Sequence, residues 1–417
     1  MLTNFTPYII SWNTTWRCNL RCAHCYLDAK SDGQSPGELT TKDGFRLIDE
    51  IASVNPETML ILTGGEPLLR SDIFELSKYA SGKGLMVVLG TNGNLVNDDV
   101  AQELKRCGVS GVGISLDSTG PDIHDSFRGV KGTWNETIKG IEACKKHGLD
   151  FQIQTTVTRN NYTEIPQLIE YAKSLGARVF NLFFLVCTGR GRNITDITEN
   201  QYEEILSYLA KIQHELKPGG MIIRARCAPI YRRILYQNNP ESPLLKTDAS
   251  GCLAGTHYCR ITPEGDVTPC PYMPVSVGNV KTSSFVDIWE NSEHFKKFRS
   301  PSLKGKCGIC EFRLICGGCR AKAYASYGDY MDEDNYCLYE PVPVSVPVPV
   351  PVSAPDTDTD TDTNPQWTTE AEERIKKIPF FIRGKIKKAI EQYARKTNCQ
   401  IITPKVLEEI RDKILHK

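Results

Sequence analysis

Three cysteines near the N-terminus have the spacing of ligands in an iron–sulfur centre. Cys18, Cys22 and Cys25 stand at C-x3-C-x2-C spacing, directly after a run at residues 8–13 that alternates as a strand does. Three thiolates on one loop can hold three irons of a [4Fe–4S] cluster and leave the fourth iron without a protein ligand. An open coordination position is where a metal centre does chemistry. A zinc site that lacks a ligand, or three unrelated thiols, are the alternatives.

A second motif follows at the end of an apolar stretch. Residues 59–63 predict a buried strand, and they lead directly into Gly64, Gly65, Glu66 and Pro67. Glycines at a strand end let a ligand approach the backbone closely. The carboxylate of Glu66 would accept a hydrogen bond from the ammonium group of such a ligand.

The elements that must position these motifs lie between residues 8 and 216. Strand-like and helix-like segments alternate there six times, which predicts a parallel sheet because each crossover contains a helix. Such units can close partly into a barrel whose reactive end is formed by the C-terminal ends of the strands. We therefore expect an α/β fold, with a partial (β/α)6 barrel over residues 1–216. Polar residues at its strand ends include Ser115, Asp117 and Arg159.

In the order and spacing of both motifs, the chain resembles the radical S-adenosylmethionine (SAM) enzymes. The resemblance implies that the methionine part of SAM chelates the open iron, and that one electron from the cluster cleaves the sulfonium. The resulting 5′-deoxyadenosyl radical would take a hydrogen atom from the substrate. The SAM contacts that the resemblance implies are Tyr26, Gly64, Gly65, Glu66, Ser115, Asp117 and Arg159. For the last three, ordinary turn, cap or surface roles are the alternatives.

Eight further cysteines lie between residues 252 and 337, enough for two full sets of four cluster ligands. Zinc would also accept four-cysteine sets. The spacing resembles the SPASM extension of radical SAM enzymes, with Gly265 before Cys270 and a later C-x2-C-x5-C run. By that family's interleaved pattern, one auxiliary cluster would be held by Cys252, Cys259, Cys270 and Cys319. The other would be held by Cys307, Cys310, Cys316 and Cys337. Cys319 follows at x2 where the family commonly has x3, and a single auxiliary cluster is the alternative.

The C-terminal part of the chain changes character twice. Residues 217–251 are basic and then rich in proline and serine, and we expect a transition between the barrel and a SPASM-like domain at 252–340. Alternating valine and proline, then an Asp-Thr repeat, predict a semi-rigid linker at 341–366. Residues 367–417 predict a small basic helical domain. In Ile378–Gly384 and Ile401–Pro404 this domain resembles the small C-terminal domain of protochlorophyllide reductase subunits.

Composition sets outer bounds on the function. A chain of 417 residues with 40% hydrophobic residues predicts two or three soluble domains. Its 50 basic and 50 acidic residues cancel, so the charge indicates no nucleic-acid partner. We expect no membrane span, and no signal peptide in the first residues. Sixteen cysteines without an export signal indicate metal ligation in a reducing, low-oxygen cytoplasm.

Over residues 8–340 the resemblance is greatest to radical SAM enzymes of alternative heme biosynthesis, the 12,18-didecarboxysiroheme deacetylases. The stretches that carry it are Ile61–Arg70, Ile114–Ser118, His124–Gly129, Phe183–Gly191 and His257–Gly265. The resemblance implies an iron tetrapyrrole substrate that loses two acetate side chains to give iron-coproporphyrin III, and an unidentified low-potential electron donor. Arg128, Arg190 and Arg192 are candidate contacts for the substrate carboxylates.

Three other functions compete with acetate removal. The first is radical modification of a peptide or protein, which is the common activity of SPASM enzymes. The second is a heme d1-type modification of a tetrapyrrole side chain. A non-enzymatic iron–sulfur carrier is the third. Residues Gly64–Glu66 disfavour the carrier, because a carrier needs no SAM site.

Overall fold

The chain divides into two compact units, Met1–Ser353 and Ala354–Lys417. The computed structural model describes residues 5–29, 37–194, 196–215, 220–245, 251–342, 348, 365–376, 387, 390, 391, 393, 394, 397 and 399–408. Most of the linker predicted at 341–366 lies outside these residues, and so does the stretch Ile378–Gly384. No described helix combines the length and the apolar character that crossing a bilayer requires.

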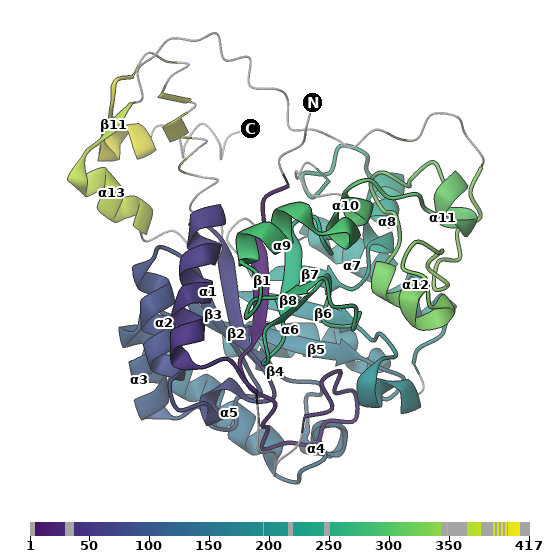
Figure 1. Cartoon of the computed structure of the whole chain (residues 1–417), viewed down its shortest axis with the longest axis horizontal. Helices are drawn as coiled ribbons and strands as arrows, with labels where there is room; N and C mark the ends of the chain where they lie inside the picture. The colour runs from purple at the N-terminus through teal and green to yellow at the C-terminus, as the bar shows by residue number, and fades with distance from the viewer. Residues whose placement is uncertain are drawn as a thin grey trace. The chain divides into compact units, whose positions relative to one another are not determined.

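A single ten-stranded sheet is the framework of the larger unit (Figure 1). Its strand order is β10-β9-β8-β1-β2-β3-β4-β5-β6-β7, and every neighbouring pair from β8 to β7 is parallel. The strands are β1 (Ile9–Asn13), β2 (Met59–Thr63), β3 (Met86–Thr91), β4 (Gly111–Ser115), β5 (Phe151–Val157), β6 (Val179–Phe184), β7 (Ile222–Arg226), β8 (Tyr258–Ile261), β9 (Asp266–Thr268) and β10 (Gly278–Asn279). The predicted α/β fold with a parallel sheet is confirmed.

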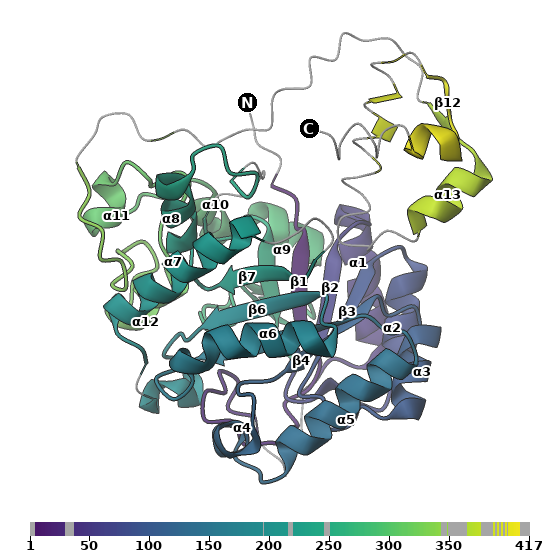
Figure 2. The ribbon, with the colours of Figure 1, turned by 180° about the vertical axis from the view of Figure 1, so that it is seen from behind.

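Helices cover the outer side of this sheet, as Figures 1 and 2 show. They are α1 (Thr41–Val54), α2 (Ile73–Gly82), α3 (Asp98–Arg106), α4 (Pro121–Arg128), α5 (Thr133–Lys146), α6 (Ile165–Leu175) and α7 (Glu199–Glu215). The strand residues that face them are apolar and form the core. In β1, for example, Ile10 and Trp12 are fully buried. Helix α1 begins at a capping box, in which Thr40 and Asp43 hydrogen-bond to each other's backbone N–H groups.

The segment predicted as a transition carries two regular elements. Strand β7 extends the sheet beyond β6, and α8 (Ile230–Asn238) follows it. The sequence did not predict strand β7, because its alternating arginines are typical of a solvated surface. At the opposite edge, β8 pairs with β1, so the boundary predicted at residue 252 does not divide the sheet.

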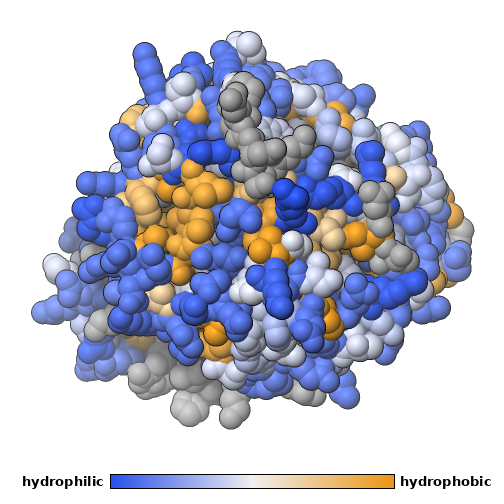
Figure 3. Space-filling model, turned by 90° about the horizontal axis from the view of Figure 1, so that it is seen from below, coloured by the Kyte–Doolittle hydropathy of each residue, from blue (hydrophilic) through white to orange (hydrophobic). Residues whose placement is uncertain are grey.

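The remaining helices of the larger unit belong to the cysteine-rich segment. They are α9 (Phe285–Asn291), α10 (Glu293–Arg299), α11 (Gly305–Ile309) and α12 (Arg320–Tyr327). Short 3-10 turns lie at Pro67–Leu69, Tyr162–Glu164 and Gly189–Asn193. Seen from below, the surface is mostly hydrophilic, and its apolar residues gather in a few patches (Figure 3).

The C-terminal unit has a core of its own. Strand β11 (Gln366–Trp367) pairs with β12 (Ile401–Ile402), and α13 (Thr369–Lys376) follows β11. Its buried apolar residues are Ala371, Ile375, Ile390, Ala394 and Ile402. The larger unit, in turn, holds the chain as far as Val348, whose N–H donates to the carbonyl of Glu311 at 2.7 Å.

We expect a chain that ends at Ser353 to fold like the full-length protein, because each unit buries its own apolar residues. Its thermal unfolding temperature should equal that of the larger unit in the full-length protein. After anaerobic purification, the two proteins should contain the same amount of iron per chain. Calorimetry and a colorimetric iron assay measure both. Loss of iron on truncation would show that the C-terminal unit is part of the metal-binding fold.

Candidate active site and metal centres

The loop after β1 carries the three motif cysteines and has no regular structure of its own. Cys18 is buried, and Cys22 and Cys25 are half-buried, within a small apolar cluster that includes Leu20 and Leu27. Burial, with smaller effects from the neighbouring thiols, raises the pKa of Cys18 to about 12. A buried thiol ionises readily only when a metal compensates its charge. Three such thiols on one loop fit the three-iron ligand set of a [4Fe–4S] cluster.

The end of β2 packs directly against this loop. The N–H of Gly65 donates to the carbonyl of Thr15 at 2.8 Å, and that of Glu66 to the carbonyl of Arg17 at 2.7 Å. A Cβ at Gly65 would lie 2.1 Å from the carbonyl oxygen of Arg17, and one at Gly64 would lie 2.7 Å from that of Thr15. The glycines are therefore required first for close packing of the cysteine loop, a role that the sequence had not indicated.

Glu66 is a fully buried carboxylate between β2 and β3. It accepts hydrogen bonds from the hydroxyl of Thr91 at 2.8 Å and from the N–H of Asn92 at 2.9 Å. Burial raises the pKa of Glu66 to about 7, although these donors act in the opposite direction. A cation beside it would offset the cost of burying its charge. The geometry thus fits the predicted contact with an amino group, and the side chain of Asn92 links the site to Asn19 of the cysteine loop at 2.7 Å.

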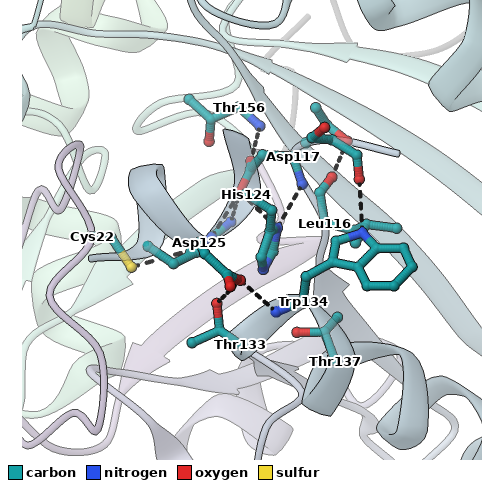
Figure 4. A network of polar contacts seen from close by, with 12 residues as sticks. Cys22, Leu116, Asp117, His124, Asp125, Thr133, Trp134, Thr137 and Thr156 are labelled. Carbon is teal, nitrogen blue, oxygen red and sulfur yellow. Dashed lines mark hydrogen bonds and ion pairs between the residues drawn. The ribbon is translucent and has the colours of Figure 1, made fainter. Parts of the chain in front are cut away.

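A buried ion pair connects β4 and α4 to the cysteine loop (Figure 4). Arg128 donates to the carboxylate of Asp117 at 2.6 and 2.7 Å, and its third nitrogen lies 3.6 Å from the sulfur of Cys22. The N–H of Thr156 donates to the other oxygen of Asp117 at 2.9 Å. Burial alone would raise the pKa of Asp117, but Arg128 holds it below its usual value. Both residues are thus engaged with each other, and the predicted contacts of Asp117 with SAM and of Arg128 with substrate remain predictions.

The second predicted substrate arginine also holds the cysteine loop. Arg190 donates to the carbonyls of Cys22 at 3.0 Å and Ala29 at 2.9 Å, and forms an ion pair with Asp28 at 2.9 Å. Its role in the structure is to brace the loop from the side of the Gly189–Asn193 turn. Arg192, two residues on, is exposed.

Three predicted SAM contacts lie around this centre without a role that the described contacts define. Ser115 is half-buried at the end of β4, and Arg159 is exposed after β5. The hydroxyl of Tyr26 accepts a hydrogen bond from the side chain of Asn13 at 3.0 Å, and its ring packs edge-on against Tyr272 at 5.3 Å. Their contact with SAM remains a prediction.

One predicted set of auxiliary ligands is gathered around a single cavity. Its members are Cys307, Cys310, Cys316 and Cys337. The backbone N–H groups of Phe312, Gly318 and Asp334 each point at one of these sulfurs, over 3.4 to 3.5 Å. Arg233 and Lys306 line the same cavity. Backbone donors and basic side chains around four thiols suit a negatively charged cluster.

The other predicted set is only partly brought together. Cys252, Cys270 and Cys319 share one packed cluster, whereas Cys259 lies on β8 with its fully buried side chain in the apolar core. The structure therefore separates Cys259 from its predicted partners, because its place on the strand directs it to the opposite face of the sheet. Cys227, which the spacing assigned to neither set, packs against Cys252, Cys270 and Cys319 instead.

Among the residues that the structure describes, no three Cys, His, Asp or Glu side chains form a group that could hold a metal ion. Burial, with the thiols of Cys227 and Cys252, raises the pKa of Cys319 well above its usual value. Thiols that lie this close together can act as joint ligands, and cysteine thiolates bind both iron–sulfur clusters and zinc.

Family models match three parts of the chain. The Radical SAM superfamily matches residues 12–172, the iron–sulfur cluster-binding SPASM domain matches 252–311, and the proto-chlorophyllide reductase 57 kD subunit family matches 367–411. Among solved structures, SuiB of Streptococcus suis bound to S-adenosylmethionine superposes with a TM-score of 0.63 at 19% identity, over 80% of this chain and 78% of that one. This likeness shows a shared fold.

Two curated relatives from Methanosarcina barkeri align over most of their length. The AdoMet-dependent heme synthase is 43% identical over 349 residues, which cover 82% of this chain and 98% of that protein. The Fe-coproporphyrin III synthase is 30% identical over 350 residues, which cover 79% of this chain and 87% of that protein.

We expect Arg128→Ala to destabilise the protein by about 3–5 kcal/mol, because it leaves the charge of Asp117 buried and unpaired. Urea unfolding of the metal-free protein measures the change. Arg192→Ala is the matched control, and as an exposed substitution it should change the free energy of unfolding by less than about 0.5 kcal/mol. Unchanged stability of Arg128→Ala, together with weakened substrate binding, would contradict the structural role and support the predicted contact with substrate.

Proposed function

Because this chain belongs to the radical SAM superfamily and carries a SPASM iron–sulfur cluster-binding domain, we propose that it acts in heme biosynthesis on an iron tetrapyrrole. Family membership confirms the predicted enzyme class and the predicted cofactors, a [4Fe–4S] cluster and SAM. The greater similarity to the heme synthase than to the Fe-coproporphyrin III synthase favours the step that forms heme itself.

The observation that carries this proposal is the cationic inner face of the sheet. Sheet register pairs Arg224 with Asn181 and Arg226 with Phe183, so these four side chains share the face that α1–α7 do not cover. Asn181 accepts a hydrogen bond from Arg226 at 3.1 Å and donates to Gln152 at 2.7 Å. Burial lowers the pKa of Arg224 to about 10, and lowers that of Arg226 as well.

A third arginine approaches the same face from the other edge of the sheet. Arg260 of β8 is paired in register with Ser11, is buried, and donates to the side chain of Asn13. The hydroxyl of Ser11 lies 2.6 Å from that of Tyr258. Buried guanidinium groups that line an inner face are suited to bind carboxylates. A coproporphyrin carries several carboxylates.

The proposed chemistry is the conversion of propionate side chains to vinyl groups, by which heme differs from Fe-coproporphyrin III. When bound, SAM and its cluster supply the radical that removes a hydrogen atom from the propionate carbon next to the ring. Loss of the carboxylate as CO2 and of one electron then leaves the vinyl group. An auxiliary centre in the same chain is a suitable acceptor for that electron, and an external low-potential donor must supply the electron that starts each cycle.

The residues of this chain contribute binding and orientation. In this proposal Glu66 holds the SAM amino group, and the Asp117–Arg128 pair keeps the cysteine loop in position. Arg224 and Arg226 would hold substrate carboxylates and so orient the reacting side chain towards the cysteine loop. Removal of acetate side chains, which the sequence favoured, is the second candidate, supported by the relative named Fe-coproporphyrin III synthase.

We expect anaerobic incubation with SAM, a low-potential reductant and Fe-coproporphyrin III to yield heme. Mass spectrometry of the tetrapyrrole should show stepwise loss of two formic acid equivalents, one for each propionate that is converted to a vinyl group. 5′-Deoxyadenosine should be formed alongside. Parallel reactions with 12,18-didecarboxysiroheme and with a peptide substrate are the controls. Acetate loss from 12,18-didecarboxysiroheme with Fe-coproporphyrin III unchanged would establish the second candidate, and modification of the peptide alone would reject both.

We expect Arg226→Met to raise the substrate Kd about tenfold or more, because it removes a charge-assisted hydrogen bond of about 1.5–3 kcal/mol to a carboxylate. Equilibrium titration with Fe-coproporphyrin III, followed by its absorption spectrum, measures this Kd. Arg178→Met, at a partly exposed arginine outside the inner face, is the matched control. SAM binding should be unaffected in both variants, and an unchanged Kd in Arg226→Met would remove the inner face from the substrate site.

A further inference from the structure

Cys227 occupies a strained position at the end of a strand. It follows β7 directly, and its φ of 58° lies in the left-handed region that non-glycine residues rarely adopt. The hydroxyl of Tyr202, on α7, donates to its carbonyl at 3.1 Å and holds the backbone in this turn. Strain of this kind persists where the surrounding structure requires a side chain to point in one direction.

The turn directs Cys227 to three cysteines from distant parts of the chain. It packs in one cluster with Cys252, which precedes β8, Cys270, which follows β9, and Cys319, the N-cap residue of α12. The thiols of Cys227, Cys252 and Cys319 lie close enough to Cys270 to raise its pKa, and those of Cys227 and Cys252 do the same to Cys319. Four thiols from four segments pack together in a domain whose family binds iron–sulfur clusters, and four is the number of ligands that one cluster takes.

A buried ammonium group beside these thiols is an independent indication of an anionic ligand. Lys322 is 2% exposed, and its Nζ has no hydrogen-bond partner within the described part of the chain. It lies 3.9 Å from the ring centroids of both Tyr202 and Tyr336, and its charge acts on Cys227 and Cys319. A buried charge is costly to leave without an anion beside it. Lys322 acts on the carboxylate of Asp196 as well as on the thiols. A cluster with four thiolate ligands carries further negative charge that this ammonium group would compensate.

We propose that Cys227 is the fourth ligand of an auxiliary [4Fe–4S] cluster, together with Cys252, Cys270 and Cys319, and that Lys322 is the positioned counter-charge of this cluster. Cys259, which the family's spacing suggested for this role, is a core residue. The assignment holds whichever tetrapyrrole side chain the enzyme modifies.

The test compares Cys227→Gly with Cys259→Ala in the full-length protein, reconstituted without oxygen. Glycine adopts the left-handed conformation freely, so Cys227→Gly removes the thiol without a backbone penalty. Iron and acid-labile sulfide should fall by about four atoms each per chain in Cys227→Gly, the content of one cluster. The electron paramagnetic resonance spectrum of the reduced protein should lose one component. Cys259→Ala should retain all of the iron and the full spectrum.

Two further measurements keep the assignment testable if Cys227→Gly folds poorly. In the wild-type holoenzyme, iodoacetamide should leave Cys227 unmodified until a chelator removes the iron, after which mass spectrometry should find it alkylated together with Cys252. Lys322→Met should lower the midpoint potential of one cluster, because it removes a nearby positive charge. Alkylation of Cys227 in fully loaded protein, or a wild-type iron content in Cys227→Gly, would overturn the proposal, as would iron loss in Cys259→Ala.

Discussion

The buried ion pair between Asp117 and Arg128 is the interaction on which the active centre depends. The cysteine loop has no helix or strand to hold it, yet three thiols must be presented to one cluster. The end of α4 supplies the missing support, since the carbonyls of Phe127 and Arg128 accept hydrogen bonds from the N–H groups of Ala23 and Arg21 at 2.9 and 3.1 Å. Asp117 fixes Arg128, and through it the end of α4 and the sulfur of Cys22. A charge pair in a dry site is rigid because separating it costs so much.

The two faces of the sheet carry different kinds of side chain. The outer face carries apolar side chains under helices α1–α7, and it supplies most of the buried core. The inner face carries asparagine, glutamine, serine and arginine side chains, which contribute little apolar burial. A parallel sheet normally buries both faces with apolar residues. A polar inner face is therefore a departure that packing does not explain, and it is the feature on which the proposed carboxylate-rich substrate rests.

The sulfur centres are linked by aromatic contacts as well as by the chain. Tyr26 directly follows Cys25, and its ring contacts Tyr272, which lies two residues after Cys270. The same hydroxyl of Tyr26 is held by Asn13, which in turn accepts from Arg260 of β8. The cysteine loop and the Cys227 group thus share one packed layer of polar and aromatic side chains.

Local patterns in the sequence were sufficient for the cysteine motif, the glycine–glutamate strand end and the six strand–helix units, because each depends on neighbours a few residues apart. The set Cys307, Cys310, Cys316 and Cys337 could also be predicted, since three of its members lie on one short loop. Spacing could not distinguish Cys227 from Cys259. That choice depends on which face of β8 a side chain occupies and on the left-handed turn after β7. The surroundings of Arg128 and Arg226 likewise depend on tertiary structure, because the carboxylate of Asp117 engages the first and the inner face of the sheet holds the second.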